Sequence, residues 1–222
     1  MVLDFKVSDS AVEKLLPTGW KPDAAISGPS AGANLRLVLI DQMAAHNALG
    51  RPLTPVRNLV IYVPARATGA EARGLVTAVF FTSRAGGGTS PYGGDATAAE
   101  VAVERKVRHE PSGTTGVEES WDYRTKSGDT IALQVHYIRG TATREKVDAR
   151  IYSAVKPGFF RIYRYEQGFD TVRGAGAGTE RLRKLDFKIS GERFAPLFDG
   201  TEQLIGITSV PWQQREVFLP GS

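Results

Sequence analysis

The sequence predicts a mostly β protein, built as a single antiparallel β-barrel or strongly curved sheet with one or two short helices. Apolar, β-branched segments recur at the eight-to-twelve-residue spacing typical of sandwiches and barrels. Glycine and proline supply 24 and 12 of the 222 residues, which favours many turns over long helices. Segments long enough to act as crossover helices are missing, so a parallel α/β sheet is not expected.

About ten segments have the composition of strands. The clearest is 100–109, where Val101, Val103 and Val107 alternate with polar and charged residues at the period of a half-buried strand. A glycine-containing turn at 127–129 joins two of the segments and predicts a hairpin. The predicted strands are 35–40, 59–63, 75–82, 100–109, 117–124, 130–139, 146–153, 159–165, 183–189 and 203–210.

Two short segments carry helix signals. Residues 8–10 (SDS) offer N-caps for a helix over 11–16, which the proline and glycine within 17–19 would end. Residues 42–49 are a second candidate, closed by the glycine and proline within 50–52. At about two turns each, both helices would need packing against the sheet to be stable.

We expect one domain over residues 1–222, because no shift in composition marks a boundary. A sheet of this many strands tends to curl and close, and a barrel of this size can hold a small ligand. Large apolar residues occupy both faces of some strands, as in Val79-Phe80-Phe81 and Phe159-Phe160. We therefore expect the sheet to be covered on both faces or the chain to form a homo-oligomer.

Composition excludes several classes of function. The chain has no cysteine, which rules out disulfides, thiolate zinc sites and thiol nucleophiles. A net charge of +4 without a basic tail gives little support for nucleic acid as a partner. Apolar runs stop at four or five residues and the first residues lack a signal-peptide pattern, so we predict no membrane partner and a cytoplasmic location.

Glycine-rich segments at 84–90 and 173–178 are interpreted as loops. Neither matches a phosphate-binding loop, and the second does not follow the strand–loop–helix order of a dinucleotide site. The three histidines, His46, His109 and His136, form no closely spaced pair that would indicate zinc. We therefore predict neither a cofactor nor a metal.

His136 is the first candidate catalytic residue. It lies in the middle of a predicted strand and shares a face with Gln134, whereas Leu133, Val135 and Tyr137 occupy the other face. If the polar face points into a barrel, His136 lines the cavity and can carry a proton near neutral pH. If that face points outward, His136 is a solvated surface residue. In the first case, His136→Gln should lower turnover by at least about 10²-fold.

Carboxylates at strand ends are the second kind of candidate. Asp41 ends an apolar strand, and Glu100 begins another strand after a glycine-rich turn. Strand ends often rim the mouth of a barrel, where small-molecule sites lie, so either residue is a candidate partner for His136. Turn or cap chemistry explains both residues about as well.

Arg161, Tyr163 and Tyr165 share one face of a predicted strand. An arginine with two tyrosines on one face can bind an anionic or aromatic ligand, and we predict Arg161 and Tyr163 as substrate-binding residues. A cation–π ladder on the outside of a sheet would give the same pattern. Tyr92, in the loop 90–94, is the predicted hydroxyl donor of the catalytic set.

Several stretches resemble the acetoacetate decarboxylase-like superfamily across about residues 15–220. Residues 16–20 (LPTGW) resemble the entry into the first strands of that family. The strand 75–82, the loop 90–94 (SPYGG) and the strand from Ala99 resemble its central strand, Gly-Pro loop and returning strand. The resemblance implies a barrel with a cavity for a small molecule.

Decarboxylases of that family carry a Schiff-base lysine in this loop, in a Gly-x-Pro-Lys-Lys context, but the loop here contains no lysine. Lys106, the nearest lysine in the sequence, lies in a strand among charged neighbours, where a desolvated amine of lowered pKa is not expected. The resemblance therefore implies the fold and the cavity without the imine chemistry, and it transfers no catalytic residue by position.

Together, these residues predict a cofactor-independent lyase, hydratase or isomerase that acts on a small, mostly apolar organic molecule by acid/base chemistry in a barrel cavity. Two alternatives stay open. A non-catalytic, lipocalin-like binding protein would have a cavity with few convergent polar groups, and a structural β-domain would have a filled interior. The faces that line the cavity decide among the three.

Overall fold

The computed structural model describes residues 1–69, 71–156 and 158–220 of the chain. In these residues the chain forms a curved sheet of fourteen strands with one short helix, α1 (Asp9–Glu13), and one 3-10 turn, η1 (Ala175–Ala177). The predicted mostly β class is confirmed. The strands are β1 (Val2–Lys6), β2 (Trp20–Pro22), β3 (Leu35–Gln42), β4 (Val56–Ala67), β5 (Arg73–Thr82), β6 (Gly88–Thr89), β7 (Asp95–His109), β8 (Thr115–Thr125), β9 (Thr130–Ile138), β10 (Thr143–Ser153), β11 (Phe160–Gly174), β12 (Thr179–Glu180), β13 (Leu182–Ser190) and β14 (Gln203–Phe218).

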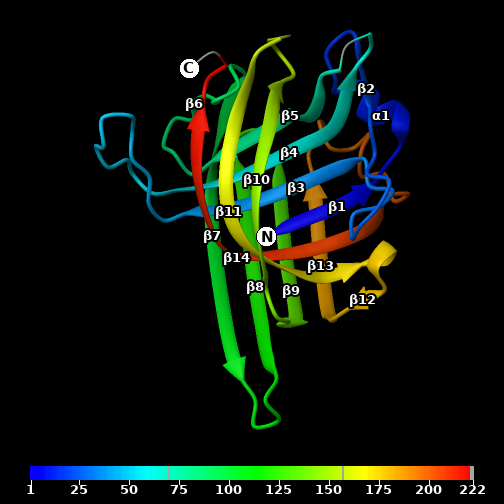
Figure 1. The fold of residues 1–222 in the computed structure, drawn as a ribbon, viewed down its shortest axis with the longest axis vertical. Helices are drawn as coiled ribbons and strands as arrows, with labels where there is room; N and C mark the ends of the chain where they lie inside the picture. Colours follow the sequence, from blue (N-terminus) through cyan, green and yellow to red (C-terminus); the bar gives the residue numbers. More distant parts are fainter. Residues whose placement is uncertain (70, 157, 221–222) are drawn as a thin grey trace.

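Seven of the strands close into a ring. Along the sheet β5 is followed by β10, β11, β14, β1, β3 and β4, and β4 pairs with β5 again, which completes the ring. On its other side β5 also pairs with β7, so that β7, β8, β9 and β13 continue from the ring as a second, open sheet (Figure 1). The predicted barrel and the predicted curved sheet are thus both present, joined at β5.

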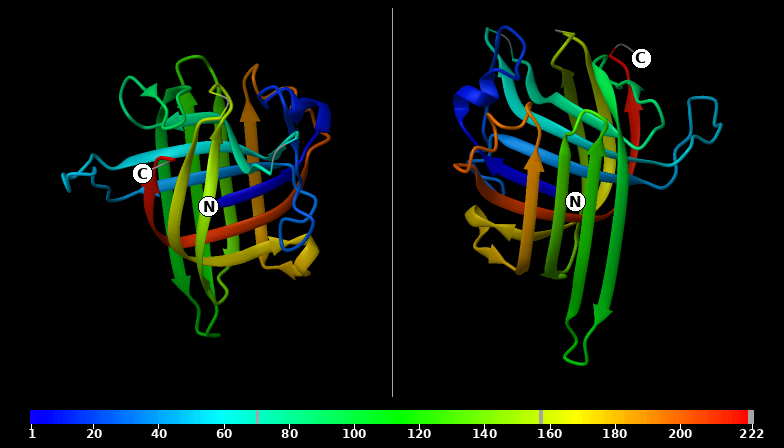
Figure 2. Two further views of the ribbon diagram at one scale, coloured as in Figure 1. Left: turned by 45° about the horizontal axis from the view of Figure 1, so that its top comes forward. Right: turned by 180° about the vertical axis from the view of Figure 1, so that it is seen from behind.

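Strands β1, β3 and β4 form a middle layer in this arrangement. The open sheet crosses one side of the layer, and β10, β11 and the C-terminal half of β14 cover the other side (Figures 1 and 2). Residues 58–63 of β4 are accordingly all buried, on both faces of the strand. At β4, the predicted burial of both faces of the sheet is therefore achieved within a single chain.

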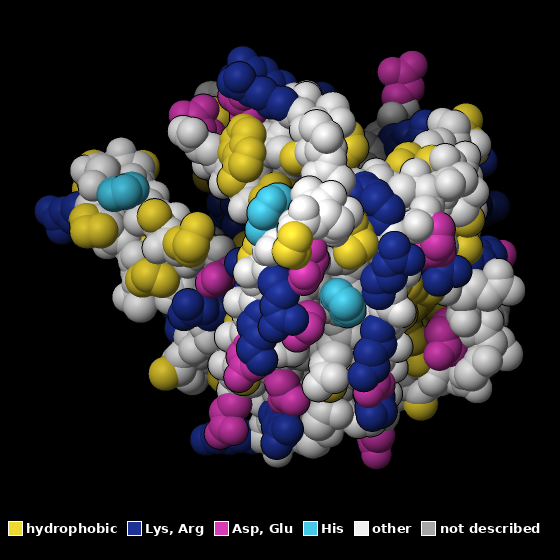
Figure 3. All heavy atoms as spheres, turned by 90° about the horizontal axis from the view of Figure 1, so that it is seen from below, with side chains coloured by type: hydrophobic (Ala, Val, Ile, Leu, Met, Phe, Trp, Pro, Cys, Tyr) yellow, Lys and Arg dark blue, Asp and Glu magenta, His cyan; other side chains and the backbone are white. Residues whose placement is uncertain are grey.

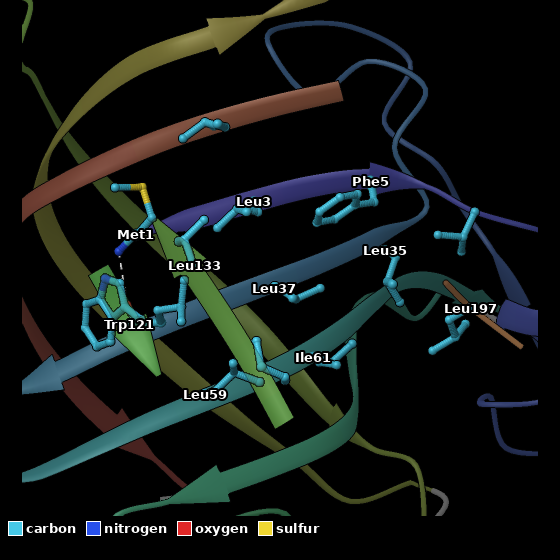
Figure 4. Close-up of a cluster of buried hydrophobic side chains, with 14 of the residues drawn as sticks. Met1, Leu3, Phe5, Leu35, Leu37, Leu59, Ile61, Trp121, Leu133 and Leu197 are labelled. Atoms are coloured by element: carbon cyan, nitrogen blue, oxygen red, sulfur yellow. Dashed lines mark hydrogen bonds between the residues drawn. The ribbon is translucent and has the colours of Figure 1, made fainter. Parts of the chain in front are cut away.

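The main apolar core lies between the middle layer and the open sheet. Leu37 on β3 stands opposite Leu3 on β1 and Ile61 on β4, and all three are fully buried. Trp121 and Leu133 of the open sheet pack in the same cluster (Figure 4). Each such side chain contributes about 1.5–3 kcal/mol by leaving water, which makes this interface the main source of stability.

The open sheet has one apolar face and one solvated face. On β9 the residues Leu133, Val135 and Tyr137 are buried, while Gln134 is exposed and His136 half-buried. This alternation is typical of an antiparallel sheet that covers a core on one side. The polar face of β9, which carries His136, is therefore the outer face.

Two strands pair with different parts of the same edge of β5. Residues 75–77 pair with β10 and residues 81–82 pair with β7, both in parallel orientation. Residues 78–80 have neither neighbour, and a bulge at Ala78 offsets β5 from β4. Bulges bend a strand and redirect its side chains, and this one lies where the ring and the open sheet diverge. The two parallel pairings depart from the wholly antiparallel arrangement that the sequence predicted.

The predicted helix over 42–49 is wrong. Strand β3 continues to residue 42, and residues 43–55 form a projecting arm between β3 and β4 (Figure 1). The side-chain oxygen of Asn47 accepts hydrogen bonds from the backbone N–H groups of Leu49 and Arg51, both at 3.0 Å. These bonds fix a turn. By accepting backbone hydrogen bonds, the Asn47 side chain stabilises this turn in place of the predicted helix.

Two other boundaries differ from the prediction. The first predicted helix is present as α1 but is shorter than expected. The last predicted strand, 203–210, runs on as β14 to Phe218. Pro211 is tolerated within the strand because, among the described residues, only one edge of this half of β14 has a strand partner. Among the described residues, the helical segment is too short to cross a membrane.

Candidate active site

A group of polar side chains lies on the inner face of the ring, which is the face that the middle layer turns away from the open sheet. Strand alternation places them there. On β3, Leu35 and Leu37 face the open sheet, whereas Arg36 points across the ring and interacts electrostatically with Glu145 of β10 and Tyr165 of β11. One strand thus serves the apolar core with one face and a polar site with the other.

Three buried tyrosines, here called the tyrosine cluster, meet on this inner face: Tyr62 of β4, Tyr92 of the loop between β6 and β7, and Tyr163 of β11. The Tyr92 hydroxyl donates a hydrogen bond to the Tyr163 hydroxyl at 2.7 Å. The phenol of Tyr62 lies close enough to both to interact with them electrostatically. Val60 and Ile151 pack around the cluster and keep water from it. Three phenols from distant parts of the chain therefore form one network.

Burial sets the protonation state of these phenols. Desolvation raises the pKa of Tyr62 and of Tyr92 well above the usual value, and the neighbouring phenol of Tyr163 raises both further. The hydroxyls therefore remain protonated across the neutral pH range. A neutral phenol in a shielded position is a suitable proton donor or hydrogen-bond donor for a developing oxyanion.

Arg215 of β14 supplies positive charge beside the cluster. Its guanidinium lies over the ring of Tyr163, 5.4 Å from the centroid, and donates a long hydrogen bond of 3.4 Å to the side chain of Gln42. Within the described residues, no carboxylate lies at ion-pair distance from Arg215. A half-buried arginine without an acidic partner is well suited to hold an anionic group of a ligand.

The other end of the inner face is more open. Asp4 is buried and binds Arg36 through two hydrogen bonds of 2.7 and 3.1 Å, while the Arg36 side chain keeps 33% of its exposure. Glu145, which is half-buried, accepts a hydrogen bond of 2.5 Å from Gln167. The pKa of Tyr165 is raised by burial and by the nearby Glu145. Solvent therefore reaches this end of the inner face.

The loop that carries Tyr92 is held in place locally. The Ser90 hydroxyl accepts a hydrogen bond of 3.2 Å from the Tyr92 N–H, and Gly93 takes a positive φ of 83° that closes the turn. Arg161 of β11 donates a 2.6 Å hydrogen bond to the carbonyl of Pro91. The structure thus brings three predicted site residues together: Arg161 fixes the loop, and Tyr92 meets Tyr163.

A pocket of about 180 Å³, here called the fork pocket, lies where β10 and β7 separate along β5. The ring of Tyr92 and that of Phe80 form part of its wall, so it adjoins the tyrosine cluster. The buried hydroxyl of Thr77 also lines the pocket and has no hydrogen-bond partner in the part of the chain that the structure describes. An unpartnered buried hydroxyl beside a pocket can bind a polar group of a ligand.

The other predicted site residues lie elsewhere. His136 lines a groove of about 330 Å³ on the outer face of the open sheet, with Glu118 and Lys184 beside it. Glu100 is exposed on β7. Asp41 shares the face of β3 that turns toward the open sheet and pairs with Arg57 at 3.0 Å. These three therefore share no cavity with the tyrosine cluster.

Sequence reasoning missed Tyr62 and Arg215. Tyr62 was hidden in an apolar run, although it is the only residue there with a hydroxyl. Arg215 lies beyond Pro211, where the last strand was predicted to have ended. Residues 212–218 (WQQREVF) show no alternation of apolar and polar residues, and only the pairing with β11 shows which face of this segment turns inward.

One lysine lies near the site. Lys156, after β10, rests against Gly93, so that its Nζ is 3.1 Å from the position that a Cβ on Gly93 would take. The Lys156 side chain is exposed, which is unlike the desolvated amine that imine chemistry favours. Among the described residues, no group of three or more His, Asp or Glu side chains is arranged to hold a metal ion.

The fold is similar to solved structures of the enduracididine biosynthesis enzyme MppR. The complex with pyruvate aligns with a TM-score of 0.56 at 14% identity, covering 99% of this chain and 85% of the other. The form with HEPES buffer gives 0.54 at 13% identity, over 98% and 82%. The form with the condensation product of pyruvate and imidazole 4-carboxaldehyde gives 0.51 at 13% identity, over 99% and 84%.

No protein-family model matches the sequence, and neither does any curated protein. At the identities of the structural matches, the likeness shows the fold alone. The mostly β fold with a curved sheet that the sequence predicted is confirmed at that level. The chain has a fold that known enzymes share, and its own residues must carry any statement about chemistry.

Proposed function

We propose that this chain is a cofactor-independent enzyme of the lyase, hydratase or isomerase type, which moves a proton on a small organic molecule held at the inner face of the ring. The tyrosine cluster with Arg215 beside it carries the proposal, because neutral donors and an unpaired cation converge there. An anionic group of the substrate would pair with Arg215. A phenol would donate to the carbonyl oxygen of the substrate as negative charge develops on it.

The position of Tyr92 supports this assignment. The decarboxylases that the chain resembles carry a Schiff-base lysine in this loop, whereas the loop 90–94 here has no lysine and carries Tyr92. A phenol cannot form an imine, but it can hold and transfer a proton. The replacement favours a site in which acid/base chemistry takes the place of a covalent intermediate.

Glu145 is the carboxylate that we assign to the site as the base. It faces Arg36 and Tyr165 across the ring, and part of it remains exposed to solvent. A carboxylate in that position can accept a proton from a carbon next to a carbonyl group while the neighbouring phenol of Tyr165 stabilises the resulting enolate.

Small oxo acids are the substrates that we propose to test first. MppR has been solved in complex with pyruvate, which carries a carboxylate next to a carbonyl. These two groups match a cation and a phenol donor placed side by side, as Arg215 and the tyrosine cluster are. The fork pocket of about 180 Å³ beside Tyr92 offers room for the apolar part of a larger substrate.

Hydrogen exchange at the methyl group of pyruvate tests the proposal. Removal of a methyl proton and return of a deuteron from D₂O would erase the methyl signal in ¹H NMR spectra. We expect wild-type protein to speed this exchange and Tyr92→Phe to slow it by about 10²-fold. Tyr152→Phe is the matched control, because Tyr152 is also a buried tyrosine but packs in the other core cluster, and it should retain the full rate.

His136→Gln distinguishes this site from the sequence-based alternative. His136 lies on the outer face, so we expect the variant to exchange at the wild-type rate. A loss of about 10²-fold in His136→Gln, together with full activity in Tyr92→Phe, would overturn the assignment of the site.

Two further measurements test the class of function. Borohydride added with pyruvate should leave the intact mass unchanged, and a reduced adduct on Lys156 would show imine chemistry instead. Saturable binding of oxo acids without any exchange or turnover would favour the alternative of a non-catalytic, small-molecule binding protein.

A further inference from the structure

The projecting arm, residues 43–55, exposes apolar side chains that none of the residues 1–69, 71–156 and 158–220 covers. Met43 is 75% exposed, Leu49 79% and Leu53 45%. The arm carries only one formal charge, on Arg51, and Figure 3 shows hydrophobic side chains gathered on the projection at the left. Apolar area of this kind on a projecting element marks an interaction site.

Internal hydrogen bonds hold the arm in a defined conformation. Beyond the bonds of the Asn47 side chain, the Asn47 N–H donates to the Arg51 carbonyl at 2.9 Å, and the Leu53 N–H donates to the Ala45 carbonyl at 2.8 Å. An isolated bridge between residues 46 and 52 completes a short two-stranded finger. A preformed finger loses little conformational entropy when it docks, which favours binding.

A second unpartnered surface lies on the same side of the molecule. Strand β14 pairs with β1 only as far as Thr208, so that within the described residues one edge of 209–218 has no strand neighbour. Trp212 and Val217 on this half are 45% and 42% exposed. The arm and this half of β14 lie side by side in Figures 1 and 2, and the hydrogen bond between Gln42 and Arg215 joins their bases.

We propose that the arm and the free half of β14 form the contact surface for a second copy of this chain. In a twofold dimer each surface meets its counterpart reciprocally, so the arm of one copy can lie on β14 of the other and the reverse. The charges are complementary: Arg51 on the arm and Glu216 on β14 are both exposed, and neither has an ion-pair partner within the described residues. A dimer would also cover the unpaired edge of β14. Exposed strand edges otherwise pair with strands of other molecules and promote aggregation.

The composition of the arm argues for a protein partner over a lipid surface. Loops that bind membranes combine aromatic residues with several Lys or Arg side chains. The arm has one arginine, no lysine and no aromatic residue. A finger with exposed apolar side chains and one cation matches the free half of β14, which exposes Trp212 and Val217 and a single acidic residue, Glu216.

Light scattering coupled to size-exclusion chromatography tests this proposal on the full chain. We expect a mass of twice 24.0 kDa at micromolar concentration. Met43→Ser with Leu49→Ser should give the monomer mass. Ile26→Ser is the matched control, since Ile26 is 90% exposed but lies in another loop, and it should leave the dimer intact.

Charge reversal tests the pairing directly. Arg51→Glu and Glu216→Arg should each raise the dimer dissociation constant by about tenfold, and the double variant should restore it. A monomeric wild type would overturn the proposal, and so would a double variant no tighter than either single one. Flotation of the wild type, but not the arm variant, with phosphatidylcholine vesicles would assign the arm to a membrane and also overturn it.

Discussion

The two faces of the middle layer are both largely buried, yet they are built from different chemistry. Toward the open sheet, β1, β3 and β4 present Leu3, Leu37 and Ile61, which have no polar group to satisfy. Toward β10 and β11 the same strands present Arg36 and Tyr62, each of which needs and has polar partners. The apolar face is stabilised by close packing and by the apolar area it buries. The polar face is stabilised only when its hydrogen bonds form in a fixed geometry.

This difference shows how a core can hold a site rigid. Neighbouring residues on one strand point to opposite faces, so the packing of Leu37 and Ile61 also fixes the backbone under Arg36 and Tyr62. Stability is therefore expected to depend mainly on one face, and chemistry on the other. Substitutions on the two faces should separate these properties.

The largest effect on stability is expected from Leu37→Ala. Leu37 is fully buried between two strands and the open sheet, so truncation leaves a cavity and should lower the free energy of unfolding by about 2–5 kcal/mol. Urea denaturation followed by tryptophan fluorescence measures it. Val38→Ala, the next residue on the half-buried inner face, is the control and should cost less. Equal losses at both positions would show that the faces do not differ in this way.

Arg215→Gln is expected to have the largest effect on ligand binding. Loss of a charge-assisted hydrogen bond, worth about 1.5–3 kcal/mol, should weaken pyruvate binding by about 10- to 100-fold in calorimetry. Stability should change little, since Arg215 is half-exposed. Arg164→Gln removes an exposed arginine from the outer face of the same ring and should bind as the wild type does. Equal weakening in both variants would point to a general effect of net charge.

The sequence was sufficient for the larger features of the fold. Alternation predicted the strands of the open sheet well, because one face of β8 and β9 is solvated and the period of two is therefore visible. The middle layer was harder, since residues 58–63 are apolar on both faces and show no period. The closure of the ring depends on β4 meeting β5 and on the parallel pairing of β5 with β10, neither of which leaves a local pattern.

Part of the candidate site was also predictable. Arg161, Tyr163 and Tyr92 were singled out because polar aromatic residues in a strand or a tight loop are unusual, and the structure brings them together. The face of His136 could not be decided, because alternation shows that two faces differ without showing which one is covered. Tyr62 and Arg215 join the cluster only through contacts between distant strands.

Acid is expected to affect the apolar side through Glu119, which is the one carboxylate that faces it from β8. Glu119 accepts two hydrogen bonds of 3.0 Å from Arg105 and one of 2.7 Å from the Trp121 ring. Burial raises the pKa of Glu119, but Arg105, the ammonium of Met1 and Trp121 outweigh it, so that the pKa in the folded state is lowered.

A lowered pKa means that Glu119 stabilises the fold above the pKa of an unfolded glutamate, and that this stability is lost as the pH falls through the folded value. Glu119→Gln should therefore cost about 1–3 kcal/mol at pH 7 and progressively less in acid. Urea unfolding of both proteins across the acid range measures the difference. A difference that does not shrink in acid would contradict the assigned role of the charge.

The smallest effect on stability is expected from Thr77→Val in the fork pocket. The buried Thr77 hydroxyl has no hydrogen-bond partner among the described residues, so its removal should leave the free energy of unfolding unchanged or raise it by less than about 1 kcal/mol. Thr82→Val is the control on the same strand, because the buried Thr82 hydroxyl accepts a hydrogen bond from the Arg84 N–H and its loss should destabilise. If Thr77→Val instead unfolds as early as Thr82→Val, the hydroxyl has a structural partner. If it is stable but binds oxo acids several-fold more weakly, the polar side of the ring extends into the fork pocket and the substrate reaches it.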